Sequence, residues 1–209
     1  YSLHHNFYYI RHNKFWEEKG YEKLPELISA SNMLPCAEDL GMIPDCVPEV
    51  LHNLKILTLE IERMPKEFGK RFGDPAHYPY LSVCATGTHD MNTLRGWWKE
   101  DRELTREYYR YSLQGKGNAP ILCTPNICKK IIQNHLDSPA MFTILPIQDW
   151  LSLSEQMRVA NPADERINTP SNRDNQWRYR MNVSLETLKK SSQLNEKILD
   201  LIKEGGRLS

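Results

Sequence analysis

Residues 81–85 (LSVCA) form a short apolar run that ends abruptly in residues 86–90 (TGTHD). A run of this length without charges is typical of a strand that is buried on both faces, as in a parallel sheet. Functional side chains in α/β proteins gather where such strands end, because the loops there converge on one pocket. We therefore predict that Asp90 belongs to a functional site.

Three other segments repeat this pattern. Residues 33–37 (MLPCA), 56–59 (ILTL) and 141–145 (MFTIL) are short apolar runs followed by acidic or amide residues. Helical patterns lie around and between them, at about 7–29 with an interruption near Pro25, at 44–54, at 92–113 in two pieces, at 125–136 and at 184–204. The alternation of strands and helices predicts an α/β fold with βαβ units and a parallel sheet.

The composition is that of a folded globular chain. Its 209 residues carry 27 Lys and Arg against 27 Asp and Glu, which argues against a nucleic-acid binder. Hydrophobic residues make up 40%, which excludes disorder, and no apolar run approaches the roughly 18–20 residues of a membrane span. The five scattered cysteines indicate reduced thiols in the cytoplasm. Cys123 and Cys128 lack a second ligand pair at zinc spacing, so we expect no metal.

Carboxylates at the predicted strand ends indicate an acid-lined pocket. We expect Glu38, Glu62, Asp90 and Asp149 around one rim. Such a rim suits either divalent-cation binding or glycosyl transfer, and the residues alone do not decide between them. The chain has no loop of clustered acids like that of a calcium site.

Aromatic residues near these segments favour sugars, because a pyranose ring stacks its apolar face on an aromatic ring. For each of them, packing in the core is the alternative. The aromatic residues concerned are Trp97, Trp98, Trp150, Trp177 and Tyr179.

Five strings in order resemble the carboxyl-terminal half of the 4-α-glucanotransferases, the amylomaltases and disproportionating enzymes of glycoside hydrolase family 77. The sequence around Glu38 and at 60–65 (EIERMP) is most similar to that of the plant-type cytosolic disproportionating enzymes and their bacterial relatives. The strings are 37–41 (AEDLG), 86–90 (TGTHD) with 96–98 (GWW), 147–149 (IQD), 166–170 (RINTP) and 177–180 (WRYR).

The resemblance implies the carboxyl-terminal half of a (β/α)8 TIM barrel with extra helices, in which residues 1–209 supply about strands five to eight. It implies transfer of α-1,4-glucan segments from a maltooligosaccharide to a glucose or glucan acceptor by a retaining double displacement, without a metal or cofactor. Glu38 is then the acid/base, which must be protonated to begin the cycle, and a dry, acidic neighbourhood favours that state. Asp90 is the transition-state stabiliser. The substrate-binding candidates are His89, Asn168, Gln148, Asp149 and Trp97.

Each assignment has a structural alternative. Asp90 could cap a helix that begins near Asn92, and Glu38 could be a solvated acid at a strand end. His89 could be a buried histidine, Asn168 could stabilise a turn, and Trp177 is expected to pack in the core.

Two departures from the family pattern affect the prediction. Ser171 stands where many amylomaltases have Gly. The nucleophilic aspartate of the family, in an upstream Arg-x-Asp string, has no counterpart here. We therefore expect the partner of this chain to be the remainder of its own catalytic domain. An α-glucan hydrolase and a non-catalytic glucan-binding protein are the alternatives.

Overall fold

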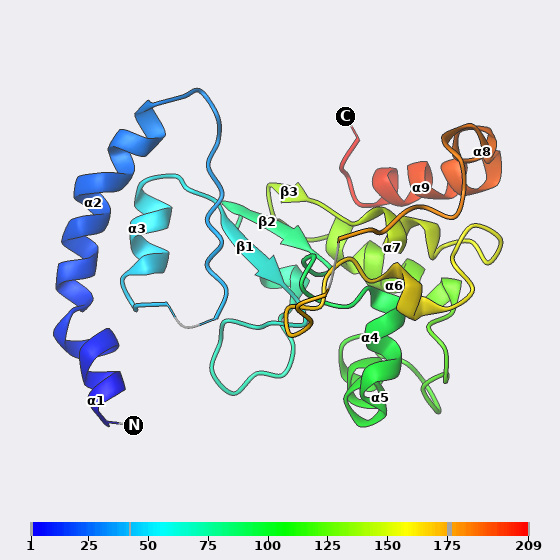
Figure 1. The fold of residues 1–209 in the computed structure, drawn as a ribbon, viewed down its shortest axis with the longest axis horizontal. Helices are drawn as coiled ribbons and strands as arrows, with labels where there is room; N and C mark the ends of the chain where they lie inside the picture. The colour runs from blue at the N-terminus through cyan, green and yellow to red at the C-terminus, as the bar shows by residue number, and fades with distance from the viewer. Residues whose placement is uncertain (1, 42, 175–176, 209) are drawn as a thin grey trace.

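A parallel sheet lies at the centre of the computed structural model, which describes residues 2–41, 43–174 and 177–208 (Figure 1). Strands β1 (Thr58–Ile61), β2 (Ser82–Ala85) and β3 (Phe142–Thr143) are hydrogen-bonded in the order β1-β2-β3, and both pairings are parallel. Next to β1, Cys36 forms an isolated parallel bridge with Leu57. The four predicted strand segments therefore lie side by side in chain order, although the first is a single bridge and the last is only two residues long.

Helices follow most of the predicted ranges. The first part of the chain forms α1 (Ser2–His5), the π-helix η1 (Asn6–Arg11), α2 (Asn13–Ser29) and α3 (Val47–Asn53), and the short 3-10 helix η2 (Pro75–His77) lies between β1 and β2. After β2 come α4 (Leu94–Glu100), α5 (Arg102–Tyr111) and α6 (Pro125–Leu136), and after β3 come α7 (Ile147–Leu151), the 3-10 helix η3 (Pro162–Glu165), α8 (Leu185–Lys190) and α9 (Ser192–Glu204).

Local chemistry explains where these helices begin and break. Asp101 separates α4 from α5, because its carboxylate accepts hydrogen bonds from the backbone N–H groups of Glu103 and Leu104 and so starts a new helix. The side chain of Thr124 caps α6, whose first residue is Pro125. The break expected near Pro25 is wrong: Pro25 lies inside α2, and the helical segment is interrupted at His12 instead.

The register of the sheet decides which side chains share a face. Leu59 pairs with Val83, and side chains alternate along a strand, so both lie on the face that lines the cavity described below. Glu60 and Glu62 then point to the opposite face, which the helices cover. There the Tyr108 hydroxyl of α5 donates to the Glu62 carboxylate at 2.6 Å. The expectation that Glu62 joins the acidic rim is therefore wrong.

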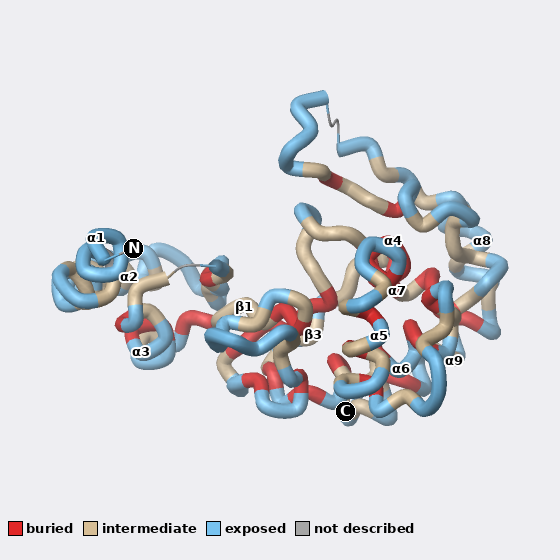
Figure 2. The backbone as a smooth tube through the Cα atoms, turned by 90° about the horizontal axis from the view of Figure 1, so that it is seen from below, coloured by how far each residue is buried: buried red, intermediate tan, exposed pale blue. Residues whose placement is uncertain are grey.

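The main core lies among the helices that follow β2. Trp98, Tyr108, Ile131 and Leu201 belong to one cluster, and each is at most 1% exposed. Figure 2 shows the buried backbone concentrated there and the amino-terminal helices mostly exposed. No described residue of α2 is buried. Within the described part of the chain, no helix has the length and apolar character that a membrane crossing requires.

Apolar side chains are exposed along both edges of the sheet. Met33 and Leu34, beside the Cys36 bridge, are 77% and 50% exposed, and Phe142 and Ile144, at β3, are 45% and 61% exposed. Isolated parallel sheets are normally covered, and open edges promote association. Both edges of the sheet are therefore open to pairing with another strand.

Glu62 shares its buried site with His135 of α6, whose Nε2 atom lies 3.8 Å from a Glu62 carboxylate oxygen. His135 Nδ1 lies 2.8 Å from the Ile131 carbonyl oxygen, which can only accept, so Nδ1 carries a proton and Nε2 of the neutral ring does not. Burial raises the pKa of Glu62 from 4.5 to about 7 and lowers that of His135 from 6.5 to about 4.

The pKa shifts of Glu62 and His135 make the free energy of unfolding depend on pH in opposite directions. The substitution Glu62→Gln should remove the part that is due to Glu62. Folded Glu62 binds more protons than unfolded Glu62 between about pH 4.5 and 7, so its contribution to stability is present at low pH and is lost as the pH rises through this window. His135 acts in the opposite direction, but it is common to both proteins. In urea unfolding, the free energy of unfolding of Glu62→Gln relative to the unsubstituted protein should rise by about 3 kcal/mol from pH 4.5 to pH 7.5. A difference that stays constant with pH would contradict this account.

Candidate active site

The candidate site is built on the loop that joins β2 to α4, residues 86–93. Its last residue, Thr93, is the N-cap of α4, and its hydroxyl oxygen accepts from the Gly96 N–H at 3.3 Å. Asp90 lies earlier in the loop, in a turn closed by a hydrogen bond from the Met91 N–H to the Thr88 carbonyl oxygen. The alternative in which Asp90 caps the helix is therefore wrong.

Asp90 contacts the segment that carries the 166–170 motif. Its Oδ1 atom accepts a hydrogen bond from the Asn168 side-chain amide, and its backbone carbonyl oxygen accepts from Arg166 at 3.4 Å. His89 Nε2 lies 3.4 Å from the same Oδ1 atom. Residues 76 and 78 positions away in the sequence thus both contact Asp90, Arg166 at the backbone carbonyl and Asn168 at the carboxylate, and Asp90 itself remains exposed.

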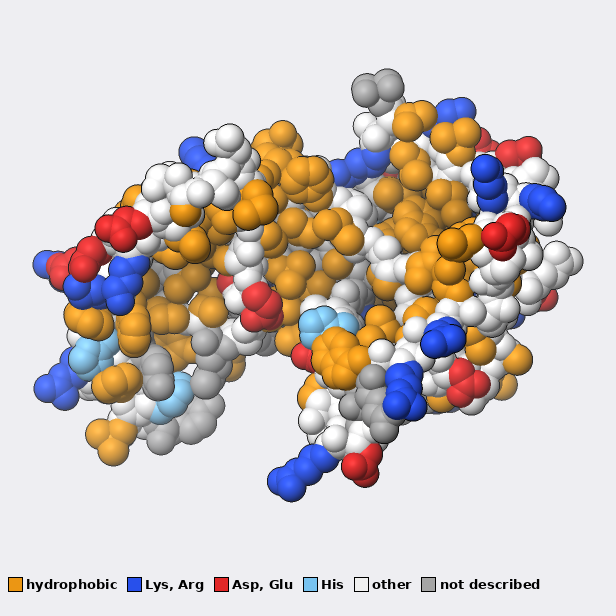
Figure 3. All heavy atoms as spheres, turned by 45° about the horizontal axis from the view of Figure 1, so that its top comes forward, with side chains coloured by type: hydrophobic (Ala, Val, Ile, Leu, Met, Phe, Trp, Pro, Cys, Tyr) orange, Lys and Arg blue, Asp and Glu red, His pale blue; other side chains and the backbone are white. Residues whose placement is uncertain are grey.

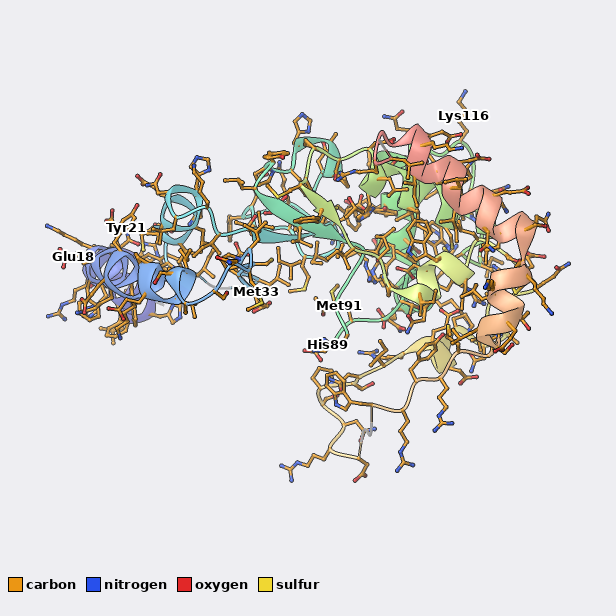
Figure 4. All side chains as sticks on the ribbon, turned by 90° about the horizontal axis from the view of Figure 1, so that it is seen from above. Glu18, Tyr21, Met33, His89, Met91 and Lys116 are labelled. Atoms are coloured by element: carbon orange, nitrogen blue, oxygen red, sulfur yellow. The ribbon has the colours of Figure 1, made fainter. Side chains whose placement is uncertain are left out.

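His89 and Trp177 form the exposed side of this group. Their ring centroids are 4.8 Å apart, and both side chains are exposed. Figure 4 shows His89 and Met91 on a loop that extends away from the sheet. The alternative of a buried His89 and the expected packing of Trp177 in the core are both wrong.

A cavity of about 270 Å³ lies between the loop and the face of the sheet that carries Leu59 and Val83. Sheet residues Leu59 and Val83 and loop residues Thr88 and His89 contribute to its wall. Figure 3 shows a hollow between the amino-terminal segment and the helical part of the protein, with apolar side chains along it. An apolar cavity next to a few converging polar groups is the usual form of a small-molecule site.

Asp149 of α7 holds the loop at both of its ends. One carboxylate oxygen accepts from the Thr86 hydroxyl at 2.6 Å, and the other accepts from the Leu94 N–H at 3.2 Å. The side chain is 1% exposed, and burial raises its pKa against the opposing effects of the Thr86 hydrogen bond and the positive charge of Arg63. Asp149 therefore lies below the rim and supports the loop, and its contact with sugar stays a prediction.

Gln148 has a similar supporting position. It is 2% exposed, and its amide donates to the backbone carbonyl oxygen of Glu165 at 3.2 Å, which attaches α7 to η3. It lines the cavity beside Asp149. Its contact with sugar also stays a prediction.

Two of the predicted aromatic contacts are core residues. Trp97 is 7% exposed and packs edge-on against Phe72 and Tyr108, and Trp98 is fully buried in the same cluster. The prediction that Trp97 contacts sugar is wrong, because the residues of α5 and the β1–β2 connection enclose its ring.

A buried ion pair that the sequence analysis missed attaches η3 to α4. Arg95 donates to Glu165, and the other Glu165 oxygen accepts from the Thr93 hydroxyl at 2.7 Å. Arg95 also donates to the Val159 carbonyl oxygen at 2.7 Å. Because Glu165 directly precedes the 166–170 motif, this pair fixes the start of the segment that brings Asn168 to Asp90. Arg95 and Glu165 each lie directly before a family motif in the sequence, which was the available signal. No sequence pattern predicts that the two side chains form a pair.

Glu38 follows the bridge at Cys36, two residues along a segment that runs parallel to β1. Its neighbour Asp39 is buried and accepts from the Leu59 N–H at 2.9 Å and from Lys66 at 2.7 Å, which attaches the segment to β1. Glu38 itself is exposed. It therefore follows the carboxyl-terminal end of a parallel segment, as predicted, but the dry neighbourhood expected for an acid/base is not supplied by the described residues.

Comparison with known proteins identifies the family. Residues 5–186 match the glycoside hydrolase family 77 profile, described as 4-alpha-glucanotransferase. The chain belongs to this family. It is 37% identical over 205 residues to a 4-alpha-glucanotransferase of Oryza sativa subsp. japonica, and 34% identical over 194 residues to one of Chlamydia muridarum. These alignments cover 98% and 90% of this chain but 22% and 36% of the relatives.

The fold is similar to that of a solved family member. An amylomaltase from Streptococcus agalactiae in complex with acarbose superposes with a TM-score of 0.67 at 20% identity, over 91% of this chain and 35% of that protein. The chain thus spans about a third or less of the length of the relatives it matches.

Removing the negative charge from the buried Arg95–Glu165 pair should destabilise the protein far more than the same change in an exposed pair. In Glu165→Gln the charge of Arg95 loses its partner away from water, and the free energy of unfolding should fall by about 3 kcal/mol. The matched control is Glu155→Gln, since Glu155 pairs with Arg158 at 2.9 Å but is 70% exposed, and less than about 1 kcal/mol is expected. Urea unfolding of both variants measures this difference, and equal effects would show that burial is not the cause.

Proposed function

We propose that the chain is part of a 4-alpha-glucanotransferase that moves α-1,4-glucan segments between maltooligosaccharides, with glucose or a glucan as acceptor. The observation that carries this proposal is the meeting of Asp90, His89 and Asn168 above an apolar cavity at the end of a parallel sheet. Family membership supports the reaction type. The acarbose bound by the streptococcal amylomaltase supports an oligosaccharide as the ligand class.

We assign Asp90 as the transition-state stabiliser. A retaining glycosyl transfer passes through an oxocarbenium-like centre, which a nearby carboxylate stabilises electrostatically. The Asn168 amide fixes one oxygen of Asp90 and leaves the other available to sugar hydroxyls. His89 lies beside the same carboxylate and is placed to donate a hydrogen bond to the same sugar unit.

We assign Glu38 as the acid/base. It would protonate the leaving glycosidic oxygen in the first step and then take a proton from the acceptor hydroxyl in the second. Each step needs this carboxyl beside the reacting bond and shielded from bulk water. Because Glu38 is exposed here, the shielding would come from bound sugar and from the rest of the catalytic domain.

We further propose that the chain forms the carboxyl-terminal half of a (β/α)8 barrel. Four parallel segments in chain order, with exposed apolar side chains at both edges, are what one half of such a barrel would present. The remaining strands would cover Met33 and Ile144 and would supply the nucleophilic carboxylate. We place the protein in the cytoplasm, since its five cysteines are all free thiols.

The first test is transfer activity on maltotriose. The polypeptide that contains these residues together with the rest of the barrel should convert maltotriose into a series of longer and shorter maltooligosaccharides, while residues 1–209 alone should be inactive because the nucleophile is missing. Chromatography of the products separates the outcomes. Shorter products without longer ones would indicate a hydrolase, binding without turnover would indicate a glucan-binding protein, and rapid glucose release by residues 1–209 would refute the half-barrel proposal.

The second test is Glu38→Gln in the longer polypeptide. An amide can neither donate the proton in the first step nor accept one in the second, so the transfer rate should fall by at least about 1000-fold. The matched control is Glu18→Gln, which replaces an exposed acid on α2 and should leave the rate unchanged. Initial rates with maltotriose decide the assignment, and Glu38→Gln activity above about a tenth of the unsubstituted rate would exclude Glu38 as acid/base.

A further inference from the structure

Arg63, which directly follows Glu62 after β1, contacts both ends of the loop that carries His89 and Asp90. Its Nε and Nη2 atoms donate to the Thr86 carbonyl oxygen at 2.9 and 2.7 Å, and Nη2 also donates to the Asn92 carbonyl oxygen at 2.9 Å. These two carbonyl groups flank residues 87–91. The guanidinium therefore sets the distance between the points where the loop leaves β2 and approaches α4.

The guanidinium is itself held in place. Its Cζ atom lies 5.3 Å from the centre of the Trp97 ring, a cation–π distance. Trp97 is fixed in the core by Phe72 and Tyr108. Burial lowers the pKa of Arg63, and the charge of Asp149 opposes that shift, so the cation is kept beside a compensating anion.

Gly87 leaves the space that Arg63 fills. A Cβ atom added at Gly87 would overlap the Nη2 atom of Arg63, so no other residue type fits here without displacing the guanidinium. Glycine is needed here because the guanidinium of Arg63 approaches the backbone closely. The φ angle of Gly87 is not in the left-handed region, so backbone conformation is not the reason.

Arg63 and Asp149 hold the loop by complementary hydrogen bonds, since Arg63 donates and Asp149 accepts. Arg63 binds carbonyl oxygens at Thr86 and Asn92, whereas Asp149 binds the Thr86 hydroxyl and the Leu94 N–H. Both residues lie beneath the loop, next to the cavity. Together they satisfy donors and acceptors at both loop ends, which leaves residues 88–90 as the part that reaches outward.

We propose that Arg63 is a positioning residue for glucan transfer: its guanidinium fixes residues 87–91 so that Asp90 and His89 meet the sugar in the reactive geometry. The inference rests on the proposed function of Asp90. Arg63 acts through backbone carbonyl groups, so its loss should lower the rate of the chemical step more than it weakens sugar binding. A displacement of about 1 Å in such a constellation lowers rates by about 100-fold.

The test compares two arginines that each bridge backbone carbonyl groups, in the longer polypeptide with the whole barrel. Lysine keeps the charge but cannot reproduce the fork of donors, so Arg63→Lys should lower kcat on maltotriose by about 100-fold, with KM changed by less than about threefold. Arg207→Lys is the matched control. Arg207 donates to the Leu136 and Ala140 carbonyl oxygens at 2.8 and 2.7 Å, before β3 and thus at the opposite end of the sheet from the loop. It should lose comparable thermal stability and keep its kcat.

Gly87→Ala provides an independent variant, because it displaces the guanidinium without removing it. It should lower kcat to a similar extent, and the double variant Arg63→Lys with Gly87→Ala should lose little more than either single one, since both act on the same contact. If Arg63→Lys does not fold, Gly87→Ala decides the matter.

The outcomes separate this inference from the proposed function. An unsubstituted protein that does not rearrange maltotriose would overturn the function and this inference with it. An active protein in which Arg63→Lys or Gly87→Ala keeps more than half of kcat would overturn the positioning role alone. The same would follow if kcat fell equally in Arg207→Lys, because the loss would then reflect general destabilisation.

Discussion

The Asp149 carboxylate is the contact on which the candidate site depends. It bonds the Thr86 hydroxyl and the Leu94 N–H, and so joins the end of β2 to the start of α4. A buried carboxylate is costly unless its oxygens are hydrogen-bonded, and both oxygens are bonded here. Because the loop between these points contains His89 and Asp90, the position of these two side chains depends on a residue that lies beneath them.

The charges around this carboxylate are arranged in compensating pairs. Arg95 forms a buried ion pair with Glu165 where η3 meets α4, and the opposite charges of Arg63 and Asp149 stabilise each other beneath the loop. Buried pairs of this kind add little to stability compared with apolar packing, but removing one partner leaves a costly unpaired charge. The hydrogen bonds of these charged side chains connect the end of β2, α4, α7 and η3 to one another. The exposed Asp90 carboxylate is thereby presented by a rigid base.

The sequence alone predicted the elements whose signals are local. Helix α6 was predicted at its exact bounds, because a proline at its first position follows a threonine cap. The strand at 81–85 was recognised from a continuous apolar run. Asp90 and Asn168 were each expected at the site through family motifs, but their direct contact was not predicted, because no local pattern links residues 78 positions apart.

The errors came from features that only the tertiary structure decides. Glu62 was placed on the rim because it follows a strand, but the side-chain alternation of β1 turns it toward Tyr108 and the helices. Trp97 was assigned to sugar, but α4 rotates it into the core. Arg63 belongs to a motif in the sequence, but its contacts are with backbone carbonyl groups of the loop after β2, which no side-chain pattern reveals.

Glu38 is exposed although the residue next to it, Asp39, is buried. Asp39 attaches this segment firmly to β1 through the Leu59 N–H and Lys66, so the segment itself is ordered at the edge of the sheet while the carboxyl beside it is open to water. A general acid acts best where water is excluded, because the low dielectric keeps the proton on the carboxyl and strengthens each later interaction. The group around Asp90 is held together by contacts within this chain. The side that must be dry lies at the open edge of the sheet, and it is there that the rest of a barrel would have to close.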